Sequence, residues 1–109
     1  MDTVNLNQRI AAKLGWAKHG LGYLRGSGDL EEHLTRLPDY ASNLQLIPEL
    51  LTFAAAHKAE FSFYMMLYET QPIFQAAFIQ GRMQCTAKDF DPCLAIGKAF
   101  VQVFDHGQG

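Results

Sequence analysis

The sequence predicts an α+β domain in which helices are layered on a three-stranded antiparallel sheet. Three observations lead to this fold class. Apolar residues recur at helical spacing near both ends of the chain and in its middle, residues 60–88 alternate in the manner of strands, and only a few residues separate one strand from the next. Because such short connections join antiparallel neighbours, we expect the order helix, loop, helix, three strands, helix. A chain of 109 residues can bury one continuous core, so we expect a single domain over residues 1–109.

The first predicted helix begins near Asn5 and ends at Gly15, a common residue at helix ends. Its apolar stripe recurs every four residues and consists of Leu6, Ile10 and Leu14. The next segment, at about residues 17–37, has no apolar period, and four of the nine glycines fall between residues 20 and 28. We expect a flexible, glycine-rich loop there, with no more than a brief helical turn within residues 29–37.

The second predicted helix covers residues 43–57 and contains Pro48. Proline lacks a backbone N–H and is tolerated in the first turn of a helix. Two alternatives follow: the helix begins at Pro48, or a longer helix from Asn43 is distorted there. Both end near Lys58.

Three strands are predicted at residues 60–69, 73–80 and 82–88, and the third has one polar face. The first of them is apolar on both faces. One face carries Phe61, Phe63, Met65 and Leu67, and the other carries Tyr64, Met66 and Tyr68. Two apolar faces indicate either that helices cover both sides of the sheet or that a binding partner covers one of them.

The last helix is predicted to begin with Asp91 as its N-cap and Pro92 at its first position. Its apolar stripe has helical spacing and consists of Cys93, Ile96, Gly97, Phe100, Val101 and Phe104. Gly97 lies within this stripe, where a missing side chain lets another backbone approach closely, and we expect it to mark the contact with the sheet.

Three segments of the chain share motifs with a known family, namely residues 6–16 (LNQRIAAKLGW), residues 38–51 (PDYASNLQLIPELL) and residues 90–99 (FDPCLAIGKA). Together they resemble the phage ABA sandwich domain family. The landmarks that match are Gly15-Trp16 after the first helix, Pro38-Asp39-Tyr40 before the second, and the run from Pro92 to Ile96 at the start of the last. The resemblance implies a layered helix, sheet and helix architecture and a phage or prophage origin. It implies no catalytic or binding residue.

Composition argues against several classes of protein. Nine Lys and Arg residues and eleven Asp and Glu residues give a formal net charge of −2, and the basic residues are scattered, so there is no nucleic-acid signature. Residues 1–14 lack an apolar signal-peptide core, and no stretch reaches membrane-spanning length, so we expect a cytoplasmic protein. The resemblance to a phage family implies that this cytoplasm is that of a bacterial host. The two cysteines, Cys85 and Cys93, have no metal-binding spacing and are expected to be reduced and buried.

No arrangement of residues indicates catalysis, a cofactor or a metal. The four histidines, His19, His33, His57 and His106, have no spacing that would bring two imidazoles to one ion. The glycine-rich segment lacks the Gly-Lys-Ser/Thr ending and the strand-to-helix context of phosphate-binding loops. No serine or cysteine has a base beside it in the sequence.

The candidate interaction residues are Trp16, Tyr23, Tyr64, Met66 and Tyr68. The first two belong to the glycine-rich region, and the others form the second apolar face of the first strand. If a helix at the N-terminus covers that face, the Tyr64 side is buried internally; if it does not, the face is available for self-association or for another protein.

The function that we expect is therefore that of a phage or prophage accessory protein, noncatalytic, acting by protein-protein interaction or self-association. The alternative is a small ligand-binding module or enzyme with a site under the segment 16–38. This alternative rests on the residues that gather there, namely Trp16, His19, Tyr23, Arg25 and His33. A third possibility is a structural subunit of a virion or a regulatory assembly.

Overall fold

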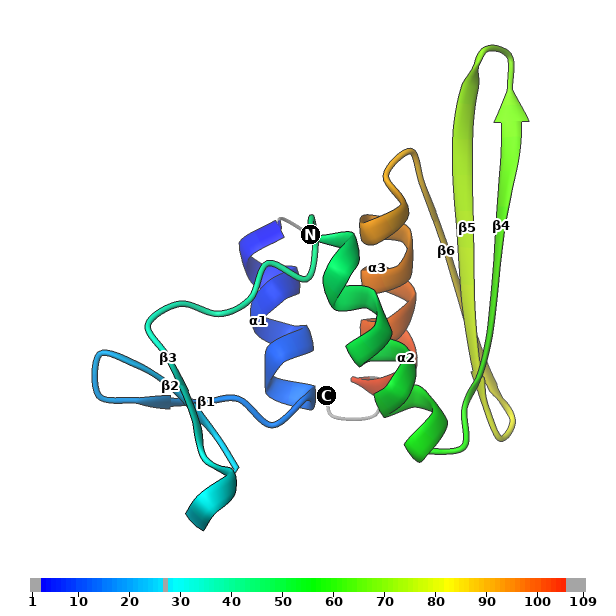
Figure 1. Cartoon of the computed structure of the whole chain (residues 1–109). Helices are drawn as coiled ribbons and strands as arrows, with labels where there is room; N and C mark the ends of the chain where they lie inside the picture. The colour runs from blue at the N-terminus through cyan, green and yellow to red at the C-terminus, as the bar shows by residue number, and fades with distance from the viewer. Residues whose placement is uncertain (1–2, 27, 106–109) are drawn as a thin grey trace.

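The α+β class is confirmed by the computed structural model, which describes residues 3–26 and 28–105. Three helices and two separate three-stranded antiparallel sheets make up the described fold (Figure 1). The helices are α1 (Thr3–Lys13), α2 (Ile47–Ala56) and α3 (Pro92–Phe104). The first sheet contains β1 (Ala17–His19), β2 (Gly22–Arg25) and β3 (Glu32–Leu34), and the second contains β4 (Glu60–Tyr68), β5 (Gln71–Gln80) and β6 (Met83–Asp89).

The first sheet corrects the prediction of a flexible loop at residues 17–37. β2 lies between β1 and β3, and Tyr23 pairs with Lys18 on one side and Leu34 on the other. Gly22 of β2 has to be a glycine, because a Cβ at this position would lie 2.3 Å from the carbonyl oxygen of Leu34. The brief helical turn expected within residues 29–37 is a short 3-10 turn (Gly28–Leu30), and β3 follows it in place of further helix.

The predicted ends of α1 and α2 are confirmed and have the same geometry. At the end of α1 the amide of Trp16 bonds to the carbonyl of Ala11, and Gly15 adopts a left-handed φ of 99°. At the end of α2 the amide of Ala59 bonds to the carbonyl of Ala54, and Lys58 takes the left-handed position with a φ of 60°. Both are the closing hydrogen bonds of a Schellman motif.

The start of α2 agrees with the first of the two alternatives for Pro48. A 3-10 turn (Leu44–Leu46), capped by the side chain of Asn43, precedes the helix. Pro48 then lies in the first turn of α2, where its missing N–H has no intrahelical partner to lose. At α3 the predicted cap is confirmed, because Asp91 accepts hydrogen bonds from the amides of Cys93 and Leu94 at 2.8 and 3.2 Å.

The main core lies between α3 and the second sheet. Phe78 of β5 and Phe100 of α3 are fully buried, with ring centroids 5.8 Å apart, and Phe104 contacts both rings. On the other side of α3, Leu6 and Ile10 of α1 pack against the helix and are also fully buried. The predicted stripe of α1 is thus confirmed, with Leu14 partly buried beside it.

The layering differs from the prediction in two respects. All three helices lie on one side of the β4–β5–β6 sheet (Figure 1), so α1 does not cover the Tyr64 face. In addition, Gly97 contacts α1 and not the sheet, since a Cβ at Gly97 would meet Ile10 Cδ1 and Leu6 Cδ2 at 3.2 Å each. The prediction had one sheet covered by helices. The structure has two sheets, and helices cover one face of the second sheet.

Candidate functional site

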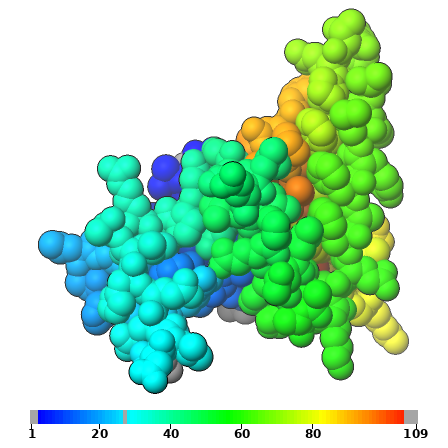
Figure 2. All heavy atoms as spheres, viewed as in Figure 1, coloured from blue at the N-terminus to red at the C-terminus, as the bar shows by residue number. Residues whose placement is uncertain are grey.

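The β4–β5 hairpin extends beyond the rest of the fold. In Figure 1 its tip rises past the ends of α2 and α3, and in Figure 2 its side chains stand clear of the body of the molecule. β6 ends at Asp89, which pairs with Phe74, so residues 71–73 of β5 and residues 66–68 of β4 have no third strand beside them. A two-stranded ribbon alone is marginally stable in water.

Large apolar side chains cover both faces of this projecting segment. Residues 63–68 of β4 are between 39% and 73% exposed, a run of six that we call the hairpin surface. Its members are Phe63, Tyr64, Met65, Met66, Leu67 and Tyr68. Monomeric proteins seldom expose a contiguous apolar patch of this kind, and Tyr, Phe and Met are enriched where proteins meet.

The register of the sheet confirms that Tyr64, Met66 and Tyr68 share one face of β4, and of the two alternatives for that face the structure has the uncovered one. Tyr64 pairs with Gln75 and Met66 with Ile73, on the side that no described helix covers. Tyr64 is 54% exposed and Tyr68 is 65% exposed.

Sequence reasoning missed the other half of the hairpin surface. Phe63, Met65 and Leu67 were expected to lie under helices, because they alternate in phase with Phe61. Phe61 does pack on Phe78, with ring centroids 4.8 Å apart, but the helix layer ends before the strand does. A signal was present in the lengths, since the two strands of the hairpin are longer than β6.

β4 is also an edge strand. The order of the sheet is β4-β5-β6, and among the described residues only β5 forms backbone pairs with β4. Along an edge, alternate N–H and C=O groups point outward without a strand to receive them. The hairpin surface therefore combines exposed apolar side chains with unpaired backbone.

Trp16 lies in the core and not on the surface, which corrects its placement among exposed contacts. It is 7% exposed, and its indole Nε1 donates a hydrogen bond to the hydroxyl of Tyr40 at 3.1 Å. The guanidinium carbon of Arg25 lies 4.4 Å from the centroid of the indole ring. Arg25 in turn forms ion pairs with Glu32 and Glu49, so the Gly15-Trp16 landmark belongs to a structural network.

Tyr40 is the buried polar centre of this network. Burial raises the pKa of Tyr40 to about 12, although the hydrogen bond from Trp16 acts in the opposite direction. The Tyr40 hydroxyl also donates a hydrogen bond to Oε2 of Glu49 at 3.3 Å. The network joins the end of α1, the first sheet and α2, which explains why β1–β3 stay docked on the helices.

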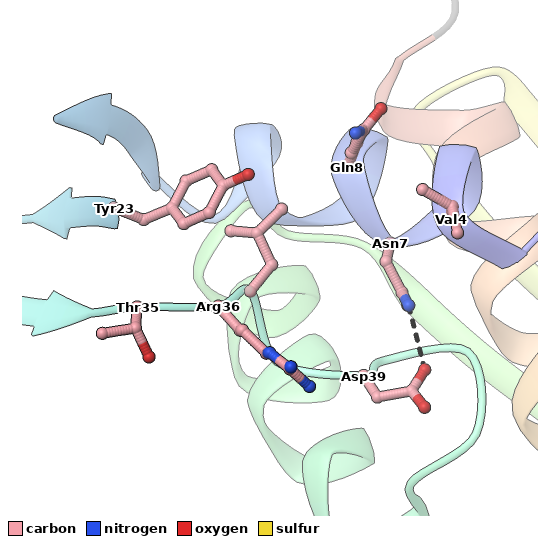
Figure 3. A pocket seen from close by; sticks show the side chains of 8 residues that line it. Val4, Asn7, Gln8, Tyr23, Thr35, Arg36 and Asp39 are labelled. Carbon is pink, nitrogen blue, oxygen red and sulfur yellow. Dashed lines mark hydrogen bonds between the residues drawn. The ribbon is translucent and has the colours of Figure 1, made fainter. Parts of the chain in front are cut away.

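Tyr23 lines a cavity of about 500 Å³ between α1 and the first sheet (Figure 3). Val4, Asn7 and Gln8 of α1 form one wall, and the other is formed by Tyr23, Thr35, Arg36, Leu37 and Asp39. Nδ2 of Asn7 donates a hydrogen bond to Oδ1 of Asp39 at 2.9 Å. Of the residues expected to share a site under segment 16–38, only Tyr23 lines this cavity; Trp16, His19, Arg25 and His33 do not.

The remaining titratable groups have local roles. His57 stacks on Phe53 at the end of α2, with centroids 4.0 Å apart, and His19 and His33 face each other across the first sheet at 6.0 Å; His106 lies outside the described residues. Burial raises the pKa of Cys85 and of Cys93, and both thiols are free, Cys93 buried and Cys85 partly buried. No cluster of three His, Cys, Asp or Glu side chains occurs within residues 3–26 and 28–105.

The acidic pair at the start of α3 has the capping role that its position indicates. Asp91 caps the helix, and Asp89 accepts hydrogen bonds from the Asp91 amide at 2.9 Å and from Lys98 at 2.7 Å. Burial raises the pKa of Asp89, but these hydrogen bonds outweigh it and leave the pKa below its ordinary value. Asp89 therefore remains ionised and ties β6 to α3.

Comparison with known proteins adds no relative. No family model matches the chain, and no curated protein or solved structure matches it either. None of the helices in the described part of the chain is long and apolar enough to span a membrane. The surface and the cavity described above are thus the features from which a function can be argued.

Proposed function

We propose that this protein is a noncatalytic phage or prophage accessory protein that acts by protein-protein interaction or self-association through the hairpin surface. The phage or prophage origin comes from the family resemblance alone, and the interaction proposal does not depend on it. The observation that carries the proposal is the run of six large, exposed apolar side chains at residues 63–68 on an edge strand.

Physical chemistry supports a protein partner at this surface. Burying the apolar side chains on both faces of the hairpin in a protein interface lowers the free energy. No described part of the fold already shields these side chains from water. The backbone N–H and C=O groups on the edge of β4 can also form hydrogen bonds with a strand of the partner. Charges are confined to the two ends of the segment, Glu60 and Glu69, so that little charge has to be desolvated at its centre.

Light scattering across a dilution series tests the proposal. We expect a mass above the 12.2 kDa of one chain at high concentration, falling toward it on dilution. The double variant Tyr64→Ser, Tyr68→Ser should weaken this association, because it removes aromatic surface without touching the core. The matched control is Leu21→Ser, Leu30→Ser, which removes two apolar side chains, each more exposed than the two tyrosines, from the region of the first sheet.

Two results would contradict the proposal. A wild-type chain that stays at the mass of one copy at every concentration, and that binds no other protein in a manner sensitive to the tyrosine variant, leaves the hairpin surface without a role. An association that is lost equally in the control variant would place the contact elsewhere.

A second candidate function is the binding of a small anionic ligand in the cavity beside α1. It is favoured by Arg36, an exposed lining residue that has no ion-pair partner among the residues the structure describes. The cavity volume lies within the range of small-molecule sites. Inorganic phosphate and citrate serve as probes: we expect a rise in Tm for the wild type that is lost in Arg36→Gln, and equal rises in both proteins would exclude this site.

A further inference from the structure

We infer that β4 pairs antiparallel with β4 of a second copy about a two-fold axis at Tyr64, so that two copies form one continuous six-stranded sheet. The inference rests on the proposed function, since it names the occupant of the hairpin surface. Three features of β4 support it. The edge of the strand is unprotected, its order of residues is self-complementary, and its end beyond the helices would lie beside the helix-covered end of the second copy's β4.

The edge of β4 lacks the devices that normally prevent strand pairing. Natural edge strands carry a lysine, a proline or a bulge, or they are very short. β4 runs for nine residues, contains none of these residue types, and pairs with β5 from Glu60↔Ile79 to Tyr68↔Gln71 without an interruption in register. Proline is present at the hairpin, but it is Pro72 on β5, and it therefore leaves the free edge of β4, on the other side of the ribbon, unprotected.

The order of residues in β4 allows the strand to pair antiparallel with an identical strand. In an antiparallel pair centred on Tyr64, Glu60 of one copy lies opposite Tyr68 of the other, and Phe61 lies opposite Leu67. No like charges then face each other, because Glu60 is the only charged residue of the strand. Ser62 faces Met66, Phe63 faces Met65, and the two Tyr64 side chains meet at the axis.

The same register places the tip of each hairpin beside the base of the other. A two-fold axis perpendicular to the sheet keeps both helix layers on one side of it. Leu67, which extends past its own helices, then lies next to the second copy's Phe61, which is under its helix layer. Each ribbon tip also gains a third strand, which is what a two-stranded ribbon needs to be stable.

The hairpin surface offers area that self-association can bury in part. With roughly 200 Å² for a fully exposed large side chain, the exposed fractions of residues 63–68 correspond to about 650 Å² per copy. Edge pairing covers the flanks of these side chains and the backbone of β4, while their outer ends stay on the two faces of the joined sheet. The contact is therefore smaller than the roughly 800 Å² per partner of a standard specific interface, which fits an association that dilution reverses.

Two lysine variants on the same face test the pairing. Tyr64→Lys brings two like charges together at the axis, and we expect it to raise the dimer dissociation constant by at least about tenfold. Tyr68→Lys, the matched control, removes a tyrosine of similar exposure but places the lysine opposite Glu60 of the second copy. We expect its dissociation constant to stay within about threefold of the wild type. Circular dichroism verifies that both variants fold.

Mixing gives an independent readout. Tyr64→Lys and Tyr64→Glu each repel themselves, but together they place opposite charges at the axis, so a mixture should form heterodimers more tightly than either variant forms homodimers. Sedimentation or light scattering of the separate and mixed variants measures this. Equal weakening by Tyr64→Lys and Tyr68→Lys, with no recovery on mixing, would overturn the edge pairing while leaving association through the hairpin surface intact. A wild type that never exceeds the mass of one copy would overturn self-association altogether.

Discussion

Among single residues, Tyr40 shows how a polar group is accommodated inside this protein. Its side chain is fully buried, and its hydroxyl accepts a hydrogen bond from Trp16 and donates one to Glu49. A buried hydroxyl without partners would destabilise the fold, so these two contacts offset the cost of its desolvation. Burial disfavours the ionised form of Tyr40 more than the hydrogen bond from Trp16 favours it, which is why its pKa lies above the ordinary value.

The raised pKa predicts a loss of stability in alkaline solution. In the unfolded chain Tyr40 ionises near its ordinary pKa of 10.0, whereas in the folded protein it stays protonated until about pH 12. The unfolded state therefore binds fewer protons between these values, and the free energy of unfolding falls as pH rises through them. Full ionisation corresponds to a loss on the order of 3 kcal/mol. Below pH 10 this contribution is fully present.

Urea denaturation at a series of alkaline pH values measures the effect. We expect Tyr40→Phe to be less stable than the wild type at neutral pH, because the indole N–H of Trp16 loses its acceptor, but to show a shallower decline above pH 10. Tyr64→Phe, at an exposed position, is the control and should decline as steeply as the wild type. Parallel declines for all three proteins would show that Tyr40 is not the group responsible.

At the scale of elements, α3 is the central helix, because the second sheet and α1 both pack against it. One side of it packs on β5 and β6, and the opposite side packs on α1. Gly97 faces α1 directly, since a Cβ there would lie 3.2 Å from side-chain atoms of both Leu6 and Ile10. The missing side chain is therefore a packing requirement of the helix pair.

Substitution of Gly97 tests that requirement. Gly97→Leu should destabilise the protein by about 1–3 kcal/mol or more, because the added atoms overlap Leu6 and Ile10 in a filled core. Gln102→Leu, on the exposed side of the same helix, introduces the same side chain where there is room and should have little effect. Denaturant midpoints compare the two. A Gly97→Leu protein as stable as the Gln102→Leu protein would mean that α1 does not pack closely there.

The elements that could be predicted from sequence are those with a long, regular pattern or a specific cap. α3 was recognisable from Asp91, Pro92 and its stripe, and β4, β5 and β6 from their alternation. The first sheet was not, because strands of three and four residues are too short for alternation to appear, and the glycines that allow their close approach are also typical of loops.

The candidate site was predictable in part for a related reason. Alternation fixed which side chains of β4 share a face, so Tyr64, Met66 and Tyr68 were identified together. Alternation carries no information on how far a helix layer extends along a strand, so the unequal strand lengths were the one signal for the exposure of Met65 and Leu67. Burial of Trp16 depends on Tyr40, 24 residues away in the sequence, and no local pattern indicates that contact.

At the scale of the whole molecule, the two sheets are attached with different strengths. The second sheet shares a continuous apolar core with α3, whereas β1 and β3 are exposed along their length and β2 is only partly buried. The first sheet is joined to the body mainly through the network of Trp16, Arg25, Tyr40 and Glu49. We expect it to open more easily than the rest of the fold.

Amide hydrogen exchange tests this order of stability. The amides of α3 and of the central part of β5 should exchange most slowly, and those of β1–β3 should exchange fastest among the strands. Arg25→Ala should speed exchange in β2 and leave α3 unchanged, since it removes the ion pairs with Glu32 and Glu49 but no part of the main core. Slow exchange in β2 equal to that in β5 would mean that the molecule opens as one unit.

The composition of β6 determines how far assembly through β4 can proceed. Once two β4 strands are paired, both outer edges of the joined sheet are β6 strands. Their outward face carries Gln84, Thr86 and Lys88, and Arg82 stands just before the strand. A lysine on an exposed edge resists the addition of a further strand. Under the proposed pairing we therefore expect growth to stop at two copies, so that the chain forms a closed dimer and not a fibre.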